Sequence, residues 1–286
     1  MRTFGNRFLL KVLAPACVFC LAFLLPVFRF SFDTSTLLTV ASLTLTILVG
    51  FFIAAATTNY LNLQSLLAEE EGGLIILHNL AKLVDEPGAG RIAESIDRYL
   101  VASFDFELKG YVEGTRDEFA RVAKEVDSID PPAATPRQEA ALSYLQETKS
   151  SLFKTRQSIM LASSHIVQTL HWLILSALSV SVVALLFGLR DGSPFLSIIV
   201  GLLSVSVYLI LVLLYEVDSN FFAEEGMAFL NPQEIFSAIG ALPYFPEYAI
   251  KHNRVKKLPA EYRVGVYKNF FTSREKEIKV IKRSKA

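Results

Sequence analysis

The sequence predicts an all-α integral membrane protein with four transmembrane helices and an inserted cytoplasmic helical bundle. Two observations lead to this fold class. Hydrophobic residues make up 52% of the 286 residues and the mean hydropathy is +0.41, values outside the usual range of soluble globular chains. Near the middle, residues 173–189 and 194–215 carry no charge, and helices of about 17 to 22 residues match a hydrocarbon core of roughly 30 Å.

These two apolar stretches are separated only by the charged turn Arg190-Asp191-Gly192-Ser193. A turn of this length cannot hold a domain. We therefore expect the pair to form a hairpin that crosses a membrane and returns at once.

Charge divides the chain into regions although its formal net charge is zero. Residues 59–165 have 17 acidic and 11 basic side chains, whereas residues 251–286 have 12 basic and 3 acidic ones. A basic tail beside a membrane is typical of contact with anionic lipid headgroups. The predicted domains are the amino-terminal flank with transmembrane helices 1 and 2 (1–58), a cytoplasmic helical domain (59–165), the transmembrane hairpin 3–4 (166–216) and a cytoplasmic carboxy-terminal segment with a basic tail (217–286).

The first span is expected at residues 12–28, after a flank that carries Arg2, Arg7 and Lys11. This order imitates a secretory signal, but the run contains two prolines and lacks a small-x-small cleavage site, so we expect it to be retained. Cys17 and Cys20 lie within it and share a helix face. We interpret them as small packing residues, and a redox pair is the alternative.

The second span is expected at residues 37–57, with its helix continuing out of the membrane as far as the acidic residues 69–71. Those three glutamates are interpreted as a solvated helix face. At 100° per residue, five small or hydroxylated residues fall within a sector of about 80°. They are Thr39, Ser42, Thr46, Gly50 and Thr57. This stripe predicts either a close-packing helix face or the lining of a pore that tolerates water and a passing ion.

Residues 59–165 show the spacing of several helices. We expect one helix over 74–84, a break at Pro87-Gly88-Ala89-Gly90, and two more helices around 92–100 and 119–129. A long helix begins at about Arg137, and no breaker precedes the third span. The inserted domain is therefore expected to be continuous with two membrane helices.

The fourth span repeats the stripe, and here we expect helix packing. Its residues are Ser197, Gly201, Ser204, Tyr208 and Tyr215. Farther on, Asn231-Pro232-Gln233-Glu234 is typical of a helix start. The basic end of the chain, residues 276–283, is interpreted as an amphipathic helix on the membrane or a frayed, solvated one.

Orientation follows from the basic residues beside the spans. The amino-terminal flank has three, the tail has twelve, and each short turn has one, Arg29 or Arg190. By the positive-inside rule, both termini and the central domain are cytoplasmic. We expect a multi-pass protein of a bacterial cytoplasmic (inner) membrane.

Sequence motifs of catalysis are missing from the chain: there is no glycine-rich phosphate loop, HExxH, GxSxG or metal-spaced Cys/His set. His165 and His171 are six residues apart, so they cannot face the same ligand from one helix. We expect no enzyme activity, no catalytic, cofactor-binding or metal-binding residue, and no cofactor.

The order of these parts resembles the bestrophin-like domain family over about residues 37–240. The local matches before the fourth span are Gly50-Phe51-Phe52, Glu70-Glu71 followed by Leu80 and Tyr99, and Phe187-Gly188-Leu189-Arg190. The exit motif after that span is similar to the family's and comprises Asp218, Asn220, Phe221, Phe222, Glu224 and Glu225. Phe221 stands where bestrophins have proline and Ala223 where they have glycine, which argues against the calcium-clasp function of that segment.

The resemblance implies an oligomeric anion channel, because bestrophins are oligomeric anion channels with four membrane helices per subunit. The expected partners are then the lipid bilayer, further copies of the chain and anions such as chloride, and no nucleic acid. The alternative is a non-conducting membrane sensor or scaffold whose cytoplasmic domain binds a protein partner. A thiol-active membrane enzyme that uses Cys17 and Cys20 is a third hypothesis.

Overall fold

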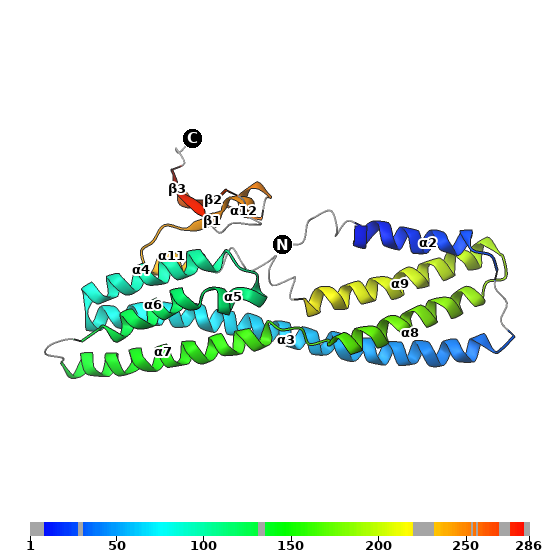
Figure 1. Cartoon of the computed structure of the whole chain (residues 1–286), viewed down its shortest axis with the longest axis horizontal. Coiled ribbons are helices and arrows are strands. Elements are labelled where there is room, and N and C mark those ends of the chain that lie inside the picture. The colour runs from blue at the N-terminus through cyan, green and yellow to red at the C-terminus, as the bar shows by residue number, and fades with distance from the viewer. Residues whose placement is uncertain are drawn as a thin grey trace. The chain divides into compact units, whose positions relative to one another are not determined.

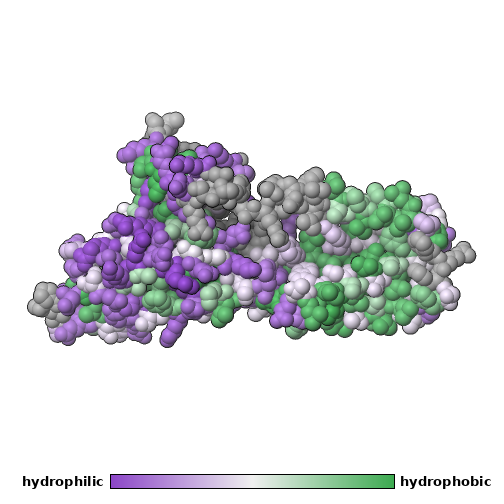
Figure 2. Space-filling view, in the orientation of Figure 1, coloured by the Kyte–Doolittle hydropathy of each residue, from purple (hydrophilic) through white to green (hydrophobic). Residues whose placement is uncertain are grey.

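The computed structural model describes residues 9–27, 31–130, 135–219, 232–252, 254–255, 257–268 and 275–282. The chain divides into two compact units, one of Met1–Tyr60 with His165–Phe221 and one of Leu61–Ser164 with Phe222–Ala286. They are called the first and the second unit below, and Figure 1 labels their elements. In Figure 2 hydrophobic residues cover most of the visible face of α2, α8 and α9, and hydrophilic residues most of that of α4 and α6.

The first unit is a set of apolar helices. They are a π-helical turn η1 (Leu9–Leu13), α2 (Ala14–Leu24), the amino-terminal part of α3 (Thr34–Val84), α8 (Thr169–Gly188) and α9 (Pro194–Asp218). Three helices, α3, α8 and α9, are long and apolar enough to cross a membrane, whereas the apolar helix over Lys11–Leu24 is shorter. Their core includes Val49 and Phe52 of α3, Leu175 of α8 and Leu214 of α9.

The second unit contains the rest of α3, α4 (Glu86–Ser103), α5 (Leu108–Gly114), α6 (Arg116–Asp127) and α7 (Pro136–Ala162). One core joins Leu77 of α3, Ile96 of α4, Phe119 of α6 and Leu145 of α7 with residues far along the chain, such as Phe236. The carboxy-terminal segment is thus part of this core. Its elements are α11 (Pro232–Ala238), β1 (Tyr244–Pro246), α12 (Glu247–Lys251), β2 (Glu261–Tyr267) and β3 (Lys276–Lys282).

Helix α3 runs unbroken through 51 residues, which confirms that the helix of the second span continues as far as the acidic residues 69–71. The helix expected over 74–84 is the carboxy-terminal part of the same helix. The predicted break at Pro87-Gly88-Ala89-Gly90 is misplaced, because the helix ends at Val84 and these residues form the first turn of α4. Asp85 caps that turn by accepting a hydrogen bond from the Gly88 amide at 2.9 Å. Proline is tolerated there, since its missing N–H has no partner in a first turn.

The expected continuity between the helix from Arg137 and the third span is wrong. Helix α7 ends at Ala162, α8 begins at Thr169, and residues 163–168 between them are not helical. This stretch contains no proline or glycine, so the sequence has no helix-breaking residue that predicts the interruption. A tertiary contact, described below, holds it.

The chain is mostly helical, but the all-α prediction is wrong for the carboxy-terminal segment. Three strands form a sheet of order β1-β2-β3, with β1 parallel and β3 antiparallel to β2. The basic end expected to be helical or frayed is strand β3. Its Ile278, Val280 and Ile281 are β-branched, and β2 alternates Tyr262, Val264 and Val266 with other residues, a period typical of strands.

Candidate functional site: the faces of α3 and three buried polar nodes

Helix α3 presents three faces in the first unit. One face is buried against α8 and the core through Leu45, Val49, Phe52 and Ala56. At 100° per residue, the predicted stripe lies about 100° around the helix from that face. A third face carries large exposed side chains, of which Val40, Leu43, Ile47 and Phe51 are each 58% exposed or more. The stripe therefore belongs neither to the subunit core nor to the most apolar face.

The stripe is exposed within a single chain. Thr39, Thr46, Gly50 and Thr57 are exposed, Ser42 is half-buried, and a Cβ atom placed on Gly50 would have no other heavy atom within 4 Å. The Thr39 hydroxyl donates to the Ser35 carbonyl at 3.0 Å. Such a hydroxyl has its own donor satisfied and still offers lone pairs outward.

The similar stripe on α9 is buried at three of its five residues, unlike the stripe on α3. Ser197, Gly201 and Ser204 are buried, and α9 packs along α2. A Cβ atom on Gly201 would come within 2.8 Å of the Phe19 ring, so glycine is what lets the two helices approach. The predicted packing role of this stripe is confirmed for these three residues, and the two stripes differ although their compositions are alike.

Asp218 ends α9 and holds the interruption between α7 and α8. Its carboxylate accepts hydrogen bonds from the amides of Ile166 and Val167, each at 2.9 Å, and lies 3.2 Å from Nδ1 of His165. The Asp218 side chain is 4% exposed. The two amides would otherwise be unpaired donors, so Asp218 stabilises a non-helical stretch that no local signal predicts.

The remaining exit-motif residues, Asn220, Phe221, Phe222, Glu224 and Glu225, lie outside the described residues. Of this motif, the structure therefore places Asp218 alone, as a ligand of backbone amides. In the described part of the chain, no group of three or more His, Cys, Asp or Glu side chains could hold a metal ion.

Arg190, like Asp218, is a buried charged residue that binds several backbone groups, and such a residue with its partners is called a node here. Arg190 lies in the turn after α8, is 5% exposed, and donates from Nη2 to the carbonyls of Leu25 at 2.9 Å and Pro26 at 2.6 Å. Its Nη1 donates to the Ala22 carbonyl. The guanidinium thereby binds carbonyls that the end of α2 leaves without helical partners.

The third node lies in the second unit and is centred on Glu70 of α3. Tyr111 donates to Oε2 of Glu70 at 2.6 Å, Tyr99 donates to Oε1, and Nη1 of Arg156 lies 3.1 Å from Oε1. The Glu70 residue is only 2% exposed. The interpretation of all three glutamates at 69–71 as a solvated face is therefore wrong for Glu70.

Arg156 completes this node from α7. Its Nη2 donates to the Val112 carbonyl at 2.9 Å and to the Thr115 hydroxyl at 3.0 Å, and its guanidinium carbon lies 4.3 Å from the centre of the Phe119 ring. Both charges thus have several partners, as buried ion pairs require. Glu70, Tyr99, Tyr111, Thr115 and Arg156 join four helices and the residue between α5 and α6.

The phenols of the node stay protonated donors. Burial, and then the negative charge of Glu70, hold the pKa of Tyr99 and of Tyr111 well above the usual value. The neighbouring Glu71 differs, since burial and the charges of Glu70 and Glu234 raise its pKa to about 7. Glu71 therefore changes charge near neutral pH, whereas the phenols do not.

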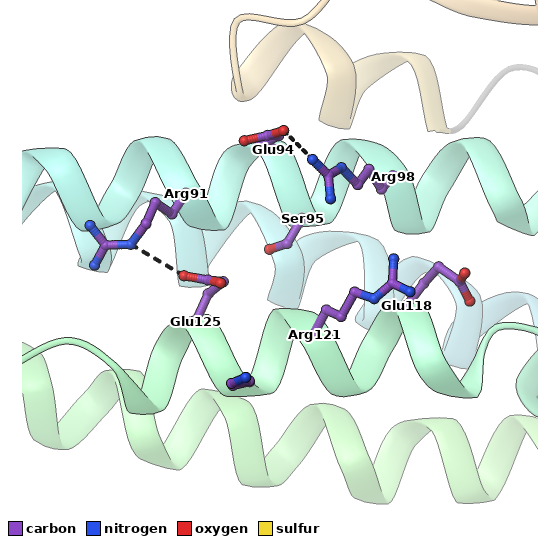
Figure 3. A pocket seen from close by; sticks show the side chains of 8 residues that line it. Arg91, Glu94, Ser95, Arg98, Glu118, Arg121 and Glu125 are labelled. Atoms are coloured by element: carbon purple, nitrogen blue, oxygen red, sulfur yellow. Dashed lines mark hydrogen bonds and ion pairs between the residues drawn. The ribbon is translucent and has the colours of Figure 1, made fainter.

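Figure 3 shows a hollow between α4 and α6 whose lining carries both signs of charge. It is lined by Arg91, Glu94, Ser95, Arg98, Glu118, Arg121, Lys124 and Glu125. Nε of Arg91 lies 3.2 Å from Oε2 of Glu125, and Arg98 pairs with Glu94. Exposed ion pairs of this kind contribute little to the stability of the fold. Because basic and acidic side chains alternate around the hollow, it has no field that would attract one class of ion.

The histidines and cysteines form no common site in the described residues. Cys17 and Cys20 are free and exposed on α2. We expected them to be packing residues, but neither packs inside the first unit. His165 contacts Asp218, and the His171 ring lies 5.0 Å from that of Phe52.

The sequence predicts the stripe, and the family resemblance points to Glu70, Tyr99, Arg190 and Asp218. Neither points to Arg156, Tyr111 or Thr115. No spacing rule links these residues, because Glu70 and Arg156 are 86 positions apart. The local signal for this site is the run Glu69-Glu70-Glu71 inside a helical pattern.

Comparison with known families agrees with the resemblance. A family model, the Bestrophin-like domain, matches residues 16–222, which is 207 of the 286 residues. The match begins within the first apolar helix, earlier than the resemblance did, and ends before α11. Searches of curated proteins and of solved structures gave no match. Because the family model covers more than half of the chain, the protein belongs to the bestrophin-like domain family of membrane proteins.

Proposed function

We propose that this protein is an oligomeric anion channel of four spans, in which the stripe on α3 lines the conducting path. The observation that carries the proposal is the exposure of the stripe on α3 in a single chain. Threonine hydroxyls and a glycine are tolerated beside water, whereas the face of Val40, Leu43, Ile47 and Phe51 suits lipid. A stripe that a single chain leaves uncovered is available to a central path between subunits.

The short helix α2 counts as the fourth span in this proposal. Lys11 lies 2.6 Å from Glu216 near the end of α9, and Arg190, which precedes α9, binds the carbonyls at the end of α2. The segment from Lys11 to Pro26 therefore reaches from one end of α9 to the other. Two antiparallel segments matched in this way cross the same thickness.

The proposed orientation places both termini and the second unit in the cytoplasm of a bacterial inner membrane. It rests on basic residues, three before the first span and twelve after residue 250, against one in each short turn. Single cysteines in place of Lys109 and Asp191, in a variant without Cys17 and Cys20, test it in intact cells. Labelling of Asp191→Cys alone by an impermeant maleimide is expected. Labelling of both, or of Lys109→Cys alone, would contradict the orientation.

Conduction is tested with the purified full-length protein in planar bilayers under a chloride gradient. Thr46→Phe should reduce the chloride current severalfold, because the ring would fill the proposed path. Thr44 is the matched control, since it lies about 160° around the same helix and its hydroxyl donates to the Val40 carbonyl. Thr44→Phe should leave the current unchanged. Equal effects of both substitutions, or no current above an empty bilayer, would contradict the proposal.

A non-conducting sensor is the second candidate, and one observation favours it. Helix α3 contributes residues to both units as a single helix of 51 residues, so a change at either end has an unbroken element to act on. This function predicts a protein without chloride current whose second unit captures a cytoplasmic partner. A chloride current that depends on Thr46 would exclude the purely non-conducting form.

A further inference from the structure

Strand β3 leaves one long edge of the sheet open. The sheet order is β1-β2-β3, so β2 covers one edge of β3, and no described strand pairs with the other. All seven residues of β3 pair one-to-one with β2, from Glu261↔Lys282 to Tyr267↔Lys276. Backbone N–H and C=O groups along an open edge are a template for a further strand.

Of the usual protections of an open edge, β3 has charged side chains, namely Lys276, Glu277, Lys279 and Lys282, and lacks three others. The strand contains no proline, its register with β2 has no bulge, and it is not short. Ile278, Val280 and Ile281 are 45%, 53% and 36% exposed. Ile278 and Val280 point to the same side of the sheet, because they are two residues apart. Two neighbouring apolar side chains beside an open edge suit cross-strand contacts with an incoming strand.

The strand is held in place before any partner arrives. Nζ of Lys276 lies 2.7 Å from Asp105 and donates to the Val101 carbonyl at 2.8 Å. Tyr267, opposite Lys276 in the register, donates to the other oxygen of Asp105 at 2.6 Å. A preordered edge loses less conformational entropy on binding than a loose tail does.

Charge indicates what kind of strand fits. The partners of Lys279 and Lys282 among the described residues are exposed: they are Glu277 and Glu261, each at 3.3 Å. Such pairs exchange easily for others. Residues 251–286 carry 12 basic and 3 acidic side chains. A second copy of β3 would bring the same excess of positive charge, which opposes self-pairing. Burial of the edge in lipid would leave its backbone groups without partners.

We propose that the open edge of β3 binds an extended acidic segment of a partner protein as an added strand. Carboxylates on one face of the segment would pair with Lys279, and apolar residues on its other face would cover Ile278 and Val280. This interaction surface is independent of conduction through the first unit. It gives the basic end of the chain a peptide-binding role.

The test uses the full-length protein in nanodiscs of neutral lipid and a labelled heptapeptide of alternating glutamate and valine. Binding measured by fluorescence anisotropy should be accompanied by slower amide hydrogen exchange in residues 276–282. Lys279→Glu should weaken binding about two- to fivefold, the effect of one cross-strand charge pair reversed. Lys257→Glu is the matched control, because Lys257 is exposed in the same basic region but outside the strands.

Several outcomes would overturn the proposal. One is equal binding of a peptide in which every backbone nitrogen is methylated, since such a peptide has no N–H group to donate to the strand edge. Another is equal weakening by Lys257→Glu and Lys279→Glu, which would indicate unspecific attraction. Binding to phosphatidylserine vesicles without peptide binding would assign the surface to lipid headgroups. Concentration-dependent protection of residues 276–282 without peptide would assign it to a second copy.

Discussion

Arg156 of α7 and Glu70 of α3 form an ion pair at 3.1 Å in which both side chains are at most 5% exposed. Tyr99, Tyr111 and Thr115 complete the hydrogen bonds of the two charges. Charges buried this deeply cost several kcal/mol each unless they are paired, and they tie together the elements that carry them. The pair therefore fixes how α3, the helix of the proposed conducting path, packs within the second unit.

Arg156→Met should lower the free energy of unfolding by about 3–5 kcal/mol, because Glu70 would be left buried without its cation. Urea unfolding of the detergent-solubilised protein, followed by circular dichroism, measures the loss. Arg98→Met is the control: Arg98 pairs with Glu94 in an exposed i,i+4 arrangement, so a change below about 1 kcal/mol is expected. Similar losses of unfolding free energy in the two variants would show that the buried ion pair stabilises the protein no more than the exposed pair does.

Asp218→Ala should destabilise the stretch between α7 and α8 by about 1–3 kcal/mol, because the Ile166 and Val167 amides lose their acceptor. Amide hydrogen exchange at these two residues should become faster than in the wild type. Asp218→Asn keeps a side-chain oxygen that can accept both bonds, so it should lose less. Unchanged exchange in Asp218→Ala would mean that the amides find other partners.

Gly201→Val should lower the free energy of unfolding by about 1–3 kcal/mol, because its Cβ would meet the Phe19 ring. Gly50→Val, in the other stripe, has open space at its Cβ. In monomeric, detergent-solubilised protein we expect a change within about 0.5 kcal/mol for it. Thermal unfolding of both variants compares the two stripes directly, and a larger loss from Gly50→Val would contradict the exposed face of α3.

Glu71 should make stability depend on pH between about 4.5 and 7. Its pKa is raised from 4.5 to about 7 in the folded protein, so the folded state binds more protons than the unfolded state in this window. The contribution of this group to the free energy of unfolding is fully present below pH 4.5 and is lost as the pH rises to 7. Glu71→Gln should therefore be more stable than the wild type at pH 8, by roughly 2 kcal/mol, and equal to it at pH 4.

Urea unfolding at pH 4, 6 and 8 measures this dependence. Glu113→Gln removes a carboxylate from an exposed position of α5 and should leave the pH profile unchanged. A wild-type profile that rises from pH 5 to 8 in step with Glu71→Gln would show that the Glu71 carboxyl titrates normally.

Local patterns predicted the elements whose cause is local. The apolar stretches at 173–189 and 194–215 became α8 and α9, since composition and length alone decide whether a helix suits a bilayer. The start of α11 at Pro232 followed from its capping sequence. The segment expected to be helical or frayed is strand β3. Its β-branched residues Ile278, Val280 and Ile281 favour a strand, although the spacing of its basic residues also fits an amphipathic helix.

The stripes mark where local reasoning stops. Composition is similar on α3 and α9, yet α2 covers one stripe and leaves the other open. Which stripe is covered depends on where α2 packs, and that position is set by Arg190 and Lys11 at its two ends. These contacts join residues more than 160 positions apart, which no local pattern specifies.

By itself the sequence determined that this chain is a membrane protein, because the length of each apolar segment and the positions of its charged residues are properties of single segments. It also determined the family, since the order of the segments is a linear property. Only the tertiary structure decided which polar residues are buried and what they hold: Glu70 with Arg156, Asp218 with the amides of Ile166 and Val167, and Arg190 with the end of α2. Burial is a property of the assembled helices, and a charged residue in a linear sequence carries no sign of the partners that will compensate its desolvation.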